Sequence, residues 1–243
     1  VRVYPLPNVN FTANNNDGCG PLNVNFNNNS TPNDTGTINI MTFSWDFGNG
    51  LSSNQRNPST QFISSLVQDS IYTVSLIGFS EHSCVDTASR NIRIYPKPLA
   101  MFSMVDSTGC APLSTSFINQ STPYDTGSIN DMSFLWNFGN GLSSISRDDT
   151  VVFNASYSQD TTYNVSLIAT SEHGCIDTIN KNVIVRPDPV ISLTADRTAG
   201  CGPLTVNFSS SGLNINQYFW DFGNGTTSNL ANPSAVFQNR PDI

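Results

Sequence analysis

Two short segments carry the residue types that most readily do chemistry. Each holds Glu, His and Cys within four residues, as Glu81-His82-Ser83-Cys84 and as Glu172-His173-Gly174-Cys175. Such side chains could contribute to a zinc site, which needs three or four ligands. A disulfide explains the cysteines better, because a chain with only 12% charged residues and abundant Ser, Thr and Asn suits an oxidising, extracellular setting. We therefore predict disulfides here, and no metal or cofactor.

A second candidate for a chemical site is Asp46-Phe47-Gly48, which recurs as Asp221-Phe222-Gly223. Both segments match the Asp-Phe-Gly motif that binds magnesium in kinases. The copy between them has Asn137 in place of the Asp, and no phosphate loop, strand lysine or catalytic loop accompanies the motif. It therefore indicates a hairpin corner. The sequence offers no set of nucleophile, base and acid, so we do not expect an enzyme.

That corner belongs to a stretch, Trp-(Asp/Asn)-Phe-Gly-Asn-Gly, which the chain contains three times. A large aromatic residue, an alternating Phe and a Gly-Asn-Gly turn are typical of a buried strand that runs into a tight turn. The carboxylates vary between copies while the aromatic residues and glycines stay. The expected core and turn residues are Trp45, Phe47, Gly48, Gly50, Trp136, Phe138, Gly139, Gly141, Trp220, Phe222, Gly223 and Gly225.

The whole chain repeats with a period of 91 residues. Cys19, Cys110 and Cys201 follow one another at 91 residues, and each joint is an alternating strand that ends in Pro-x-Pro. A period of this length suits a small sandwich domain rather than a solenoid unit. We predict repeats at 6–96, at 97–187 and, incomplete, at 188–243, preceded in 1–5 by the closing strand of another repeat. The chain would then be a piece of a longer array.

Within a repeat the patterns indicate strands and turns only. We expect about seven strands in an all-β, immunoglobulin-like sandwich with the Trp on strand C. The distance from the Phe of strand B to this Trp is 19 residues in the first two repeats and 12 in the third. The extra residues form the loops 31–36 and 122–127. These loops could be a contact surface or the result of neutral drift.

Composition excludes several kinds of partner. An apolar fraction of 37% with 15 Phe is enough to build cores. A net charge of −8 with no Lys/Arg cluster argues against a nucleic-acid or anionic-membrane partner. The apolar runs are too short to span a bilayer, so we expect no direct membrane insertion. No basic segment followed by an apolar one opens the chain, so no signal peptide is visible.

The repeated stretch resembles the hallmark of the polycystic kidney disease (PKD) repeat, Trp-Asp-Phe-Gly-Asp-Gly. The resemblance covers the whole chain, since Pro-Leu-x-Val-x-Phe at 21–26 and 203–208 and Asn-Pro at 57–58 and 232–233 also match the family. The chain differs by having Asn at the second Asp position of all three copies. That difference argues against carboxylate chemistry or a strict calcium site there.

Gly-Cys-x-Pro-Leu and Cys-x-Asp-Thr make the chain similar to PKD arrays in very large surface proteins of Bacteroidota, including gliding-motility adhesins exported by the type IX system. This resemblance implies an extracellular or cell-surface stalk that extends a binding tip and bears load. Implied partners are neighbouring repeats, secretion or motility machinery, and extracellular surfaces or glycans. The alternative is a glycan- or protein-binding module beside a secreted enzyme domain.

The five cysteines raise a pairing question. The obvious bonds lie within a repeat, Cys19–Cys84 and Cys110–Cys175, each 65 residues apart. In an immunoglobulin-like order, however, strands A and G run parallel. The A–B loop, which holds Cys19, and the F–G loop, which holds Cys84, then lie at opposite poles of the sandwich. Strands of about seven residues separate the poles by roughly 20 Å, and a disulfide spans only about 7 Å between Cα atoms. We predict Cys19–Cys175 between repeats, with Cys84, Cys110 and Cys201 bonded outside this chain; pairing within repeats is the alternative.

The same bacterial resemblance implies O-glycan acceptors, at Asp-Ser or Asp-Thr followed by an apolar residue or Thr. Chance occurrence in a Ser/Thr-rich chain is an equally good explanation. The candidate acceptors are Ser70, Thr87, Ser107, Thr150, Thr161 and Thr178.

Overall fold

The computed structural model describes residues 1–33, 36–125 and 127–238, which form β-strands and two short 3-10 turns. The loop residues 34–35 and 126, and the last residues of the predicted third repeat, 239–243, lie outside this description. No helix in the described ranges is long and apolar enough to cross a membrane. Tandem β-sandwiches make up the chain, as the sequence predicts.

The first predicted repeat, 6–96, contains two facing sheets. One has the strand order β1-β3-β6 and the other the order β2-β8-β7-β4-β5. A 3-10 turn, η1 (Ile38–Ile40), precedes β4. The strands are β1 (Phe11–Ala13), β2 (Asp17–Cys19), β3 (Leu22–Asn28), β4 (Thr42–Asp46), β5 (Ser52–Ser53), β6 (Ser59–Phe62), β7 (Ser70–Phe79) and β8 (Val85–Tyr95).

One detail of this repeat differs from the expectation of about seven strands. Eight strands are present, because the first strand divides into β1 in one sheet and β2 in the other. Residues 1–5 are in no strand and have no ladder partner among the described residues, and their assignment to the closing strand of a preceding repeat stays a prediction. The order β2-β8-β7-β4, with Trp45 on β4, is immunoglobulin-like as predicted.

The core of the first repeat forms around Trp45, which is fully buried. Its ring centroid lies 5.0 Å from that of Phe11 and 5.5 Å from that of Phe26, so both sheets contribute aromatic rings. The indole Nε1 donates a 2.9 Å hydrogen bond to the carbonyl of Gln55. Alternating burial along β3 and β4 therefore brings Phe26 of β3 and both Phe43 and Trp45 of β4 into one buried cluster.

The corner after Trp45 is held by side-chain caps. The Asp46 carboxylate accepts from the backbone N–H of Gly48 at 2.8 Å, and the Asn49 side-chain oxygen accepts from the N–H of Leu51 at 3.0 Å. Gly48 has φ +71°, and a Cβ there would lie 2.7 Å from the carbonyl oxygen of Thr73. An amide oxygen caps as well as a carboxylate, so Asn137 replaces Asp and accepts from Gly139 in the same way.

The second predicted repeat, 97–187, has the same strand order. Its sheets are β14-β11-β9 and β10-β16-β15-β12-β13. Trp136 is fully buried, with its centroid 5.1 Å from that of Phe102. The elements are β9 (Phe102–Met104), β10 (Thr108–Cys110), β11 (Leu113–Asn119), η2 (Ile129–Asp131), β12 (Ser133–Asn137), β13 (Ser143–Ser144), β14 (Asp149–Phe153), β15 (Thr161–Thr170) and β16 (Ile176–Arg186).

Residues 188–238 hold only part of such a sandwich. Strands β17 (Val190–Ala195), β18 (Leu204–Leu213) and β21 (Ser234–Phe237) form one sheet, and β19 (Trp220–Asp221) pairs with β20 (Thr227–Ser228). The prediction that Trp220 and Phe222 are buried is wrong, because both are half-exposed. No counterparts of β7 and β8 occur in 188–238, so the sheet beside β19 lacks the strands that complete the core.

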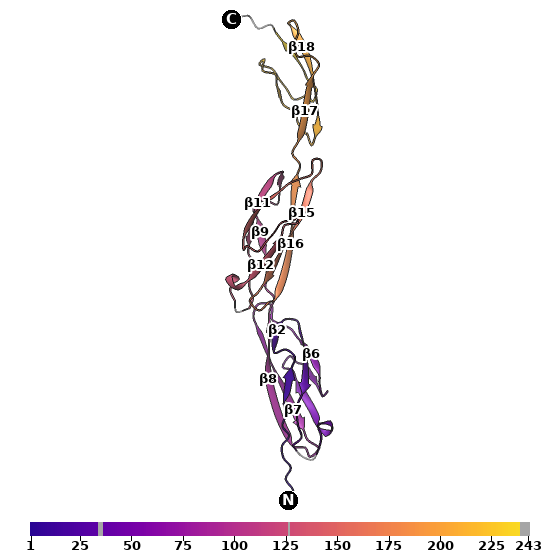
Figure 1. The fold of residues 1–243 in the computed structure, drawn as a ribbon, viewed down its shortest axis with the longest axis vertical. Helices are drawn as coiled ribbons and strands as arrows, with labels where there is room; N and C mark the ends of the chain where they lie inside the picture. Colours follow the sequence, from indigo (N-terminus) through magenta and orange to yellow (C-terminus); the bar gives the residue numbers. More distant parts are fainter. Residues whose placement is uncertain (34–35, 126, 239–243) are drawn as a thin grey trace. The chain divides into compact units, whose positions relative to one another are not determined.

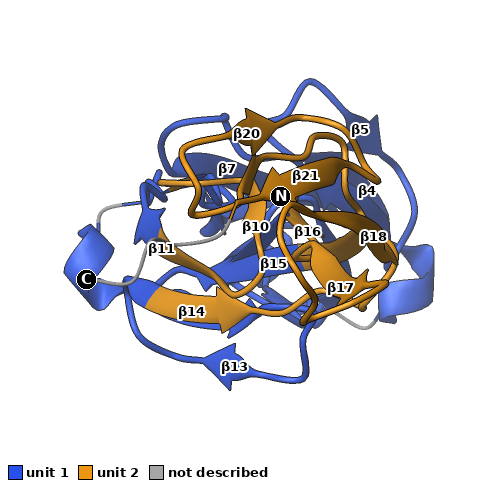
Figure 2. Ribbon diagram, turned by 90° about the horizontal axis from the view of Figure 1, so that it is seen from above, with its two compact units in different colours: residues 1–103, 117–149, 165–181 blue, residues 104–116, 150–164, 182–243 orange. Residues whose placement is uncertain are grey.

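The compact units of the chain do not follow the 91-residue period. Unit 1 comprises residues 1–103, 117–149 and 165–181, and unit 2 comprises residues 104–116, 150–164 and 182–243 (Figure 2). Strands β7 and β8, whose pairing runs the length of the first sandwich, lie in unit 1 (Figure 1). Each sheet keeps to one predicted repeat, but the second repeat is divided between the units, so the repeat boundaries stay predictions.

Candidate functional site

A disulfide links the first predicted repeat to the second within unit 1. It joins Cys19, the last residue of β2, to Cys175, the residue before β16, with a Cα–Cα distance of 5.4 Å. This is the pairing predicted from the polarity of the sandwich. Cys84, Cys110 and Cys201 have no disulfide partner in the described chain, so their bonding to residues outside it stays a prediction.

The strand register explains why Cys19 does not pair with Cys84. Strand β2 runs parallel to β8, and Cys19 lies opposite Tyr95 at the far end of β8. Cys84 precedes the first residue of β8, eleven residues before Tyr95. At about 3.3 Å per residue the two cysteines are about 36 Å apart, far beyond the reach of a disulfide. Pairing within this repeat is therefore excluded.

Aromatic stacking accompanies the disulfide at the joint. The ring of Tyr95 stacks on that of His173, with centroids 3.7 Å apart and planes 18° from parallel. Tyr95 and both prolines that follow it, Pro96 and Pro98, are buried. The Pro-x-Pro segment is thus packed, and the end of the first repeat contacts the turn that carries Cys175.

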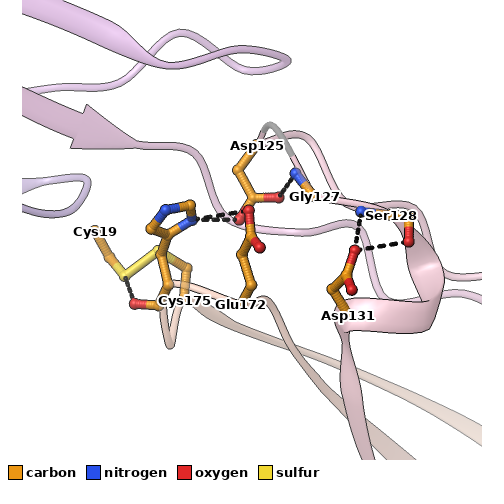
Figure 3. Close-up of polar contacts among 8 residues, drawn as sticks. Cys19, Asp125, Gly127, Ser128, Asp131, Glu172 and Cys175 are labelled. Atoms are coloured by element: carbon orange, nitrogen blue, oxygen red, sulfur yellow. Dashed lines mark hydrogen bonds and ion pairs between the residues drawn. A yellow bond between two sulfur atoms is a disulfide. The ribbon is translucent and has the colours of Figure 1, made fainter.

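The inserted loop of the second repeat reaches the same place. The side chain of Asp125 is only 1% exposed, and its Oδ2 lies 3.2 Å from Nδ1 of His173 (Figure 3). The other oxygen, Oδ1, accepts from the backbone N–H of Gly127 at 3.3 Å. Glu172 Oε1 lies 3.7 Å from the same Nδ1. The described part of loop 122–127 therefore contacts the turn that carries Cys175, and its use as a contact surface for another molecule stays a prediction.

A capping box fixes the end of this loop. The Ser128 side chain accepts from the N–H of Asn130, and the Asp131 carboxylate accepts from both the hydroxyl and the N–H of Ser128 (Figure 3). The bond from the Ser128 hydroxyl, which has the larger effect, and the bond from its N–H hold the pKa of Asp131 below its ordinary value. The η2 turn thereby begins at a defined residue.

The first repeat carries the same arrangement of rings. Tyr4 stacks on His82 with centroids 3.4 Å apart and planes 18° from parallel. Tyr4 and His82 precede Tyr95 and His173 by 91 residues each. The residue 91 before Asp125 is Asp34, which lies outside the described residues. Both histidines of the chain therefore occupy the same type of joint.

Two aspartates have a role that sequence reasoning missed. Asp86 Oδ2 accepts from the N–H of Val9, and Asp177 Oδ2 accepts from the N–H of Ala100, both at 2.8 Å. The two aspartates lie at the start of β8 and of β16, respectively. Each bond connects that strand to the segment that opens the same repeat. The signal available in the sequence is the recurrence of Cys-x-Asp-Thr at 91 residues, which indicates the family resemblance and does not reveal these hydrogen bonds.

The candidate O-glycan acceptors fall into two groups. Thr87, Ser107, Thr150 and Thr178 are exposed. Ser70 and Thr161 are half-buried, and their hydroxyls accept from the backbone N–H groups of Ser65 and Ser156. Use of any of these residues as an acceptor stays a prediction.

Of the ligand set considered for zinc, Cys175 is in the disulfide and is not available as a thiolate. Glu172 and His173 lie instead beside Asp125, with one ligand atom from each of the three within 4.8 Å of the others. A side chain from an inserted loop, 47 residues earlier in the chain, therefore takes the place expected for the cysteine.

Comparison with known proteins gives matches among solved structures only. No protein-family model and no curated protein matches the chain. The PKD1 domain of Vibrio anguillarum Epp is 25% identical, covers 39% of this chain and 99% of its own, and has a TM-score of 0.31. The PKD1 domain of the Vibrio cholerae metalloprotease PrtV is 23% identical, covers 37% of this chain and 98% of its own, and has a TM-score of 0.30.

A third similar structure comes from a 1.5-MDa bacterial ice-binding adhesin. It is 12% identical, covers 98% of this chain and 88% of its own, and has a TM-score of 0.37. The assignment of the present chain as tandem sandwiches rests on its own strand order.

Proposed function

We propose that this chain is a PKD-like stalk segment of a long secreted or cell-surface adhesin, with the role of extending a binding tip and bearing load. The observation that carries the proposal is the disulfide between Cys19 and Cys175, which spans the joint between successive repeats. A binding module needs no covalent bond across its joint. A load-bearing array gains from such a bond, because a disulfide keeps a pull from extending the segment that it closes.

The disulfide changes the path that a pulling force takes. A force applied at the N-terminus reaches Cys19 and passes through the sulfur atoms to Cys175, so the residues between them carry no load. Only 26 residues then separate Cys175 from Cys201. The covalent path from Cys19 to Cys201 is therefore about 90–100 Å long when stretched, compared with about 630 Å for the 182 residues of the unbridged chain.

The proposal extends to setting and partners. A disulfide and a surface with few charges support an extracellular or cell-surface location. The partners would be neighbouring repeats, through Cys84, Cys110 and Cys201, and beyond them secretion or motility machinery and extracellular surfaces. Gliding motility and type IX export rest on the sequence resemblance alone. We assign no enzymatic role to the chain.

An array of glycans and matrix proteins separates the stalk from its rival, a ligand-binding module. The oxidised chain of residues 1–243, labelled at an exposed position, is applied beside a known carbohydrate-binding domain as the positive control. We expect no signal above that of a labelled protein of the same charge. Saturable binding to one glycan or protein, competed by the unlabelled chain, would replace the stalk assignment with the module assignment.

A further inference from the structure

We propose that Asp125, Glu172 and His173 form a site for a divalent metal ion of the zinc type beside the joint disulfide. This goes beyond the stalk assignment and does not depend on it, since the ligands lie within the second repeat whatever load the chain bears. It also revises the sequence-based expectation that the chain holds no metal.

The spacing of the three ligand atoms suits a small ion. Nδ1 of His173 lies 3.2 Å from Asp125 Oδ2 and 3.7 Å from Glu172 Oε1. Metal–ligand bonds of about 2.0–2.2 Å at tetrahedral angles place neighbouring ligand atoms about 3.3–3.6 Å apart. Both measured separations are close to this range. The ligand atoms of Asp125 and Glu172 lie within 4.8 Å of each other, so an ion between them could contact both (Figure 3).

Groups behind the ligands already orient two of them. The N–H of Gly127 holds Oδ1 of Asp125, which leaves Oδ2 for the ion. The Tyr95 ring covers one face of the His173 imidazole and fixes its plane. Partners of this kind are what orient ligands in metal sites.

Electrostatics favours a cation at this position. The Asp125 side chain is 1% exposed, and the Glu172 carboxylate faces the same imidazole nitrogen. A buried carboxylate close to a second one needs a positive charge nearby. A divalent ion would neutralise both carboxylates and leave a coordination position open to water, since Glu172 is 37% exposed.

The donor types indicate the class of ion. One imidazole nitrogen with two carboxylate oxygens suits Zn²⁺ or a related late first-row ion. Calcium prefers six to eight oxygen ligands, and magnesium keeps most of its water. The ion would connect the inserted loop to the turn between β15 and β16, and would hold the imidazole against Tyr95.

The sequence repeats the same three ligand types. Asp34, Glu81 and His82 precede Asp125, Glu172 and His173 by 91 residues each. The third repeat lacks the inserted loop and with it this aspartate. Aspartate and histidine thus occur together in both repeats that have the loop, as expected if the loop supplies a ligand.

Zinc titration of the oxidised chain tests the proposal. Residues 1–243 carry C84S, C110S and C201S, because free thiolates bind zinc, and H82Q, which leaves one imidazole in the chain. Imidazole ¹⁵N chemical shifts report which nitrogen binds, and competition with a chromophoric chelator gives the affinity. Zinc would displace the proton from Nδ1 and leave Nε2 as the protonated nitrogen. We expect one equivalent of zinc to give Nδ1 the chemical shift of a metal-bound nitrogen and Nε2 that of a protonated one, with reversal by EDTA and no effect of calcium.

Substitution of a ligand residue distinguishes zinc bound at this site from zinc that associates loosely with surface carboxylates. D125N should weaken zinc binding at least tenfold, whereas D188N, an equal change of charge outside the cluster, should leave it unchanged. If D125N does not fold, E172Q supplies the comparison at a more exposed position. Zinc binding that is equal in D125N and D188N, or zinc that does not shift Nδ1, would overturn the proposal.

Discussion

Removal of the joint disulfide should greatly increase the length that the chain releases under tension. The Cα atoms of Cys19 and Cys175 lie 5.4 Å apart, although 156 residues of sequence separate them. Fully extended, that segment spans about 560 Å at about 3.6 Å per residue. We therefore expect C19S/C175S to release about 550 Å that the oxidised chain keeps hidden, because the disulfide carries the force past the segment.

Optical tweezers measure this difference directly. Handles attached at both ends of residues 1–243 extend the oxidised chain, the C19S/C175S variant and the oxidised chain after reduction. A C84S/C110S/C201S background prevents bonds between molecules. In the oxidised chain, only residues 1–18 and 176–243 can lengthen. The variant and the reduced chain should give the same total, so that reduction serves as the matched control.

Two results would refute this reasoning. One is an oxidised chain that releases the additional length of about 550 Å at forces that leave covalent bonds intact. The other is a variant that releases no more than the oxidised chain. Either would mean that force does not pass from Cys19 to Cys175, and the load-bearing role would lose its main support.

Three further predictions concern stability and the joint. C19S/C175S should lower the free energy of unfolding by about 4–5 kcal/mol in urea followed by circular dichroism, from the entropy of the closed loop, and a loss below about 1 kcal/mol would contradict this. Y95A should cost about 2–4 kcal/mol in the same assay through loss of a buried ring, while Y95F, which keeps the stacking, should cost little; equal losses would show that the ring is not the cause. S128A should raise the pKa of Asp131 toward its ordinary value in an NMR titration, because the two bonds that lower this pKa come from Ser128 and the larger effect is that of the hydroxyl. Since the folded pKa is lowered, these bonds stabilise the turn above the ordinary pKa, and the contribution is lost as the pH falls through the folded value. An unchanged pKa in S128A would show that the hydroxyl bond is not the cause.

The disulfide can be predicted from the sequence because it depends only on the order and direction of the strands. A 91-residue period and parallel first and last strands place Cys19 and Cys84 at opposite poles, whatever the side-chain packing. The buried Trp45 followed from alternation, which is a local property. The exposure of Trp220 did not follow, because burial depends on strands that residues 188–238 do not contain.

Contacts made by loop residues could not be predicted from periodicity. Asp125 meets His173 across 48 residues, through a loop whose course no repeating pattern specifies. Asp177 directly precedes the candidate acceptor Thr178, and only the hydrogen bond that it accepts from the N–H of Ala100 shows that it closes the repeat. The signal in both cases was recurrence at 91 residues, which marks a residue as important but does not say which group it contacts.

The three joints of the chain are of two kinds. Tyr4 stacks on His82 and Tyr95 on His173, and each of these repeats has the inserted loop. At the third joint Arg186 stands where the first two have Tyr, and the following repeat lacks the loop. Loop drift would vary independently of the joint residue, whereas a loop that helps to position His173 would be lost together with its ring partner. The inserted loop and the joint tyrosine thus occur together in the first two repeats, as expected if the loop is part of the joint.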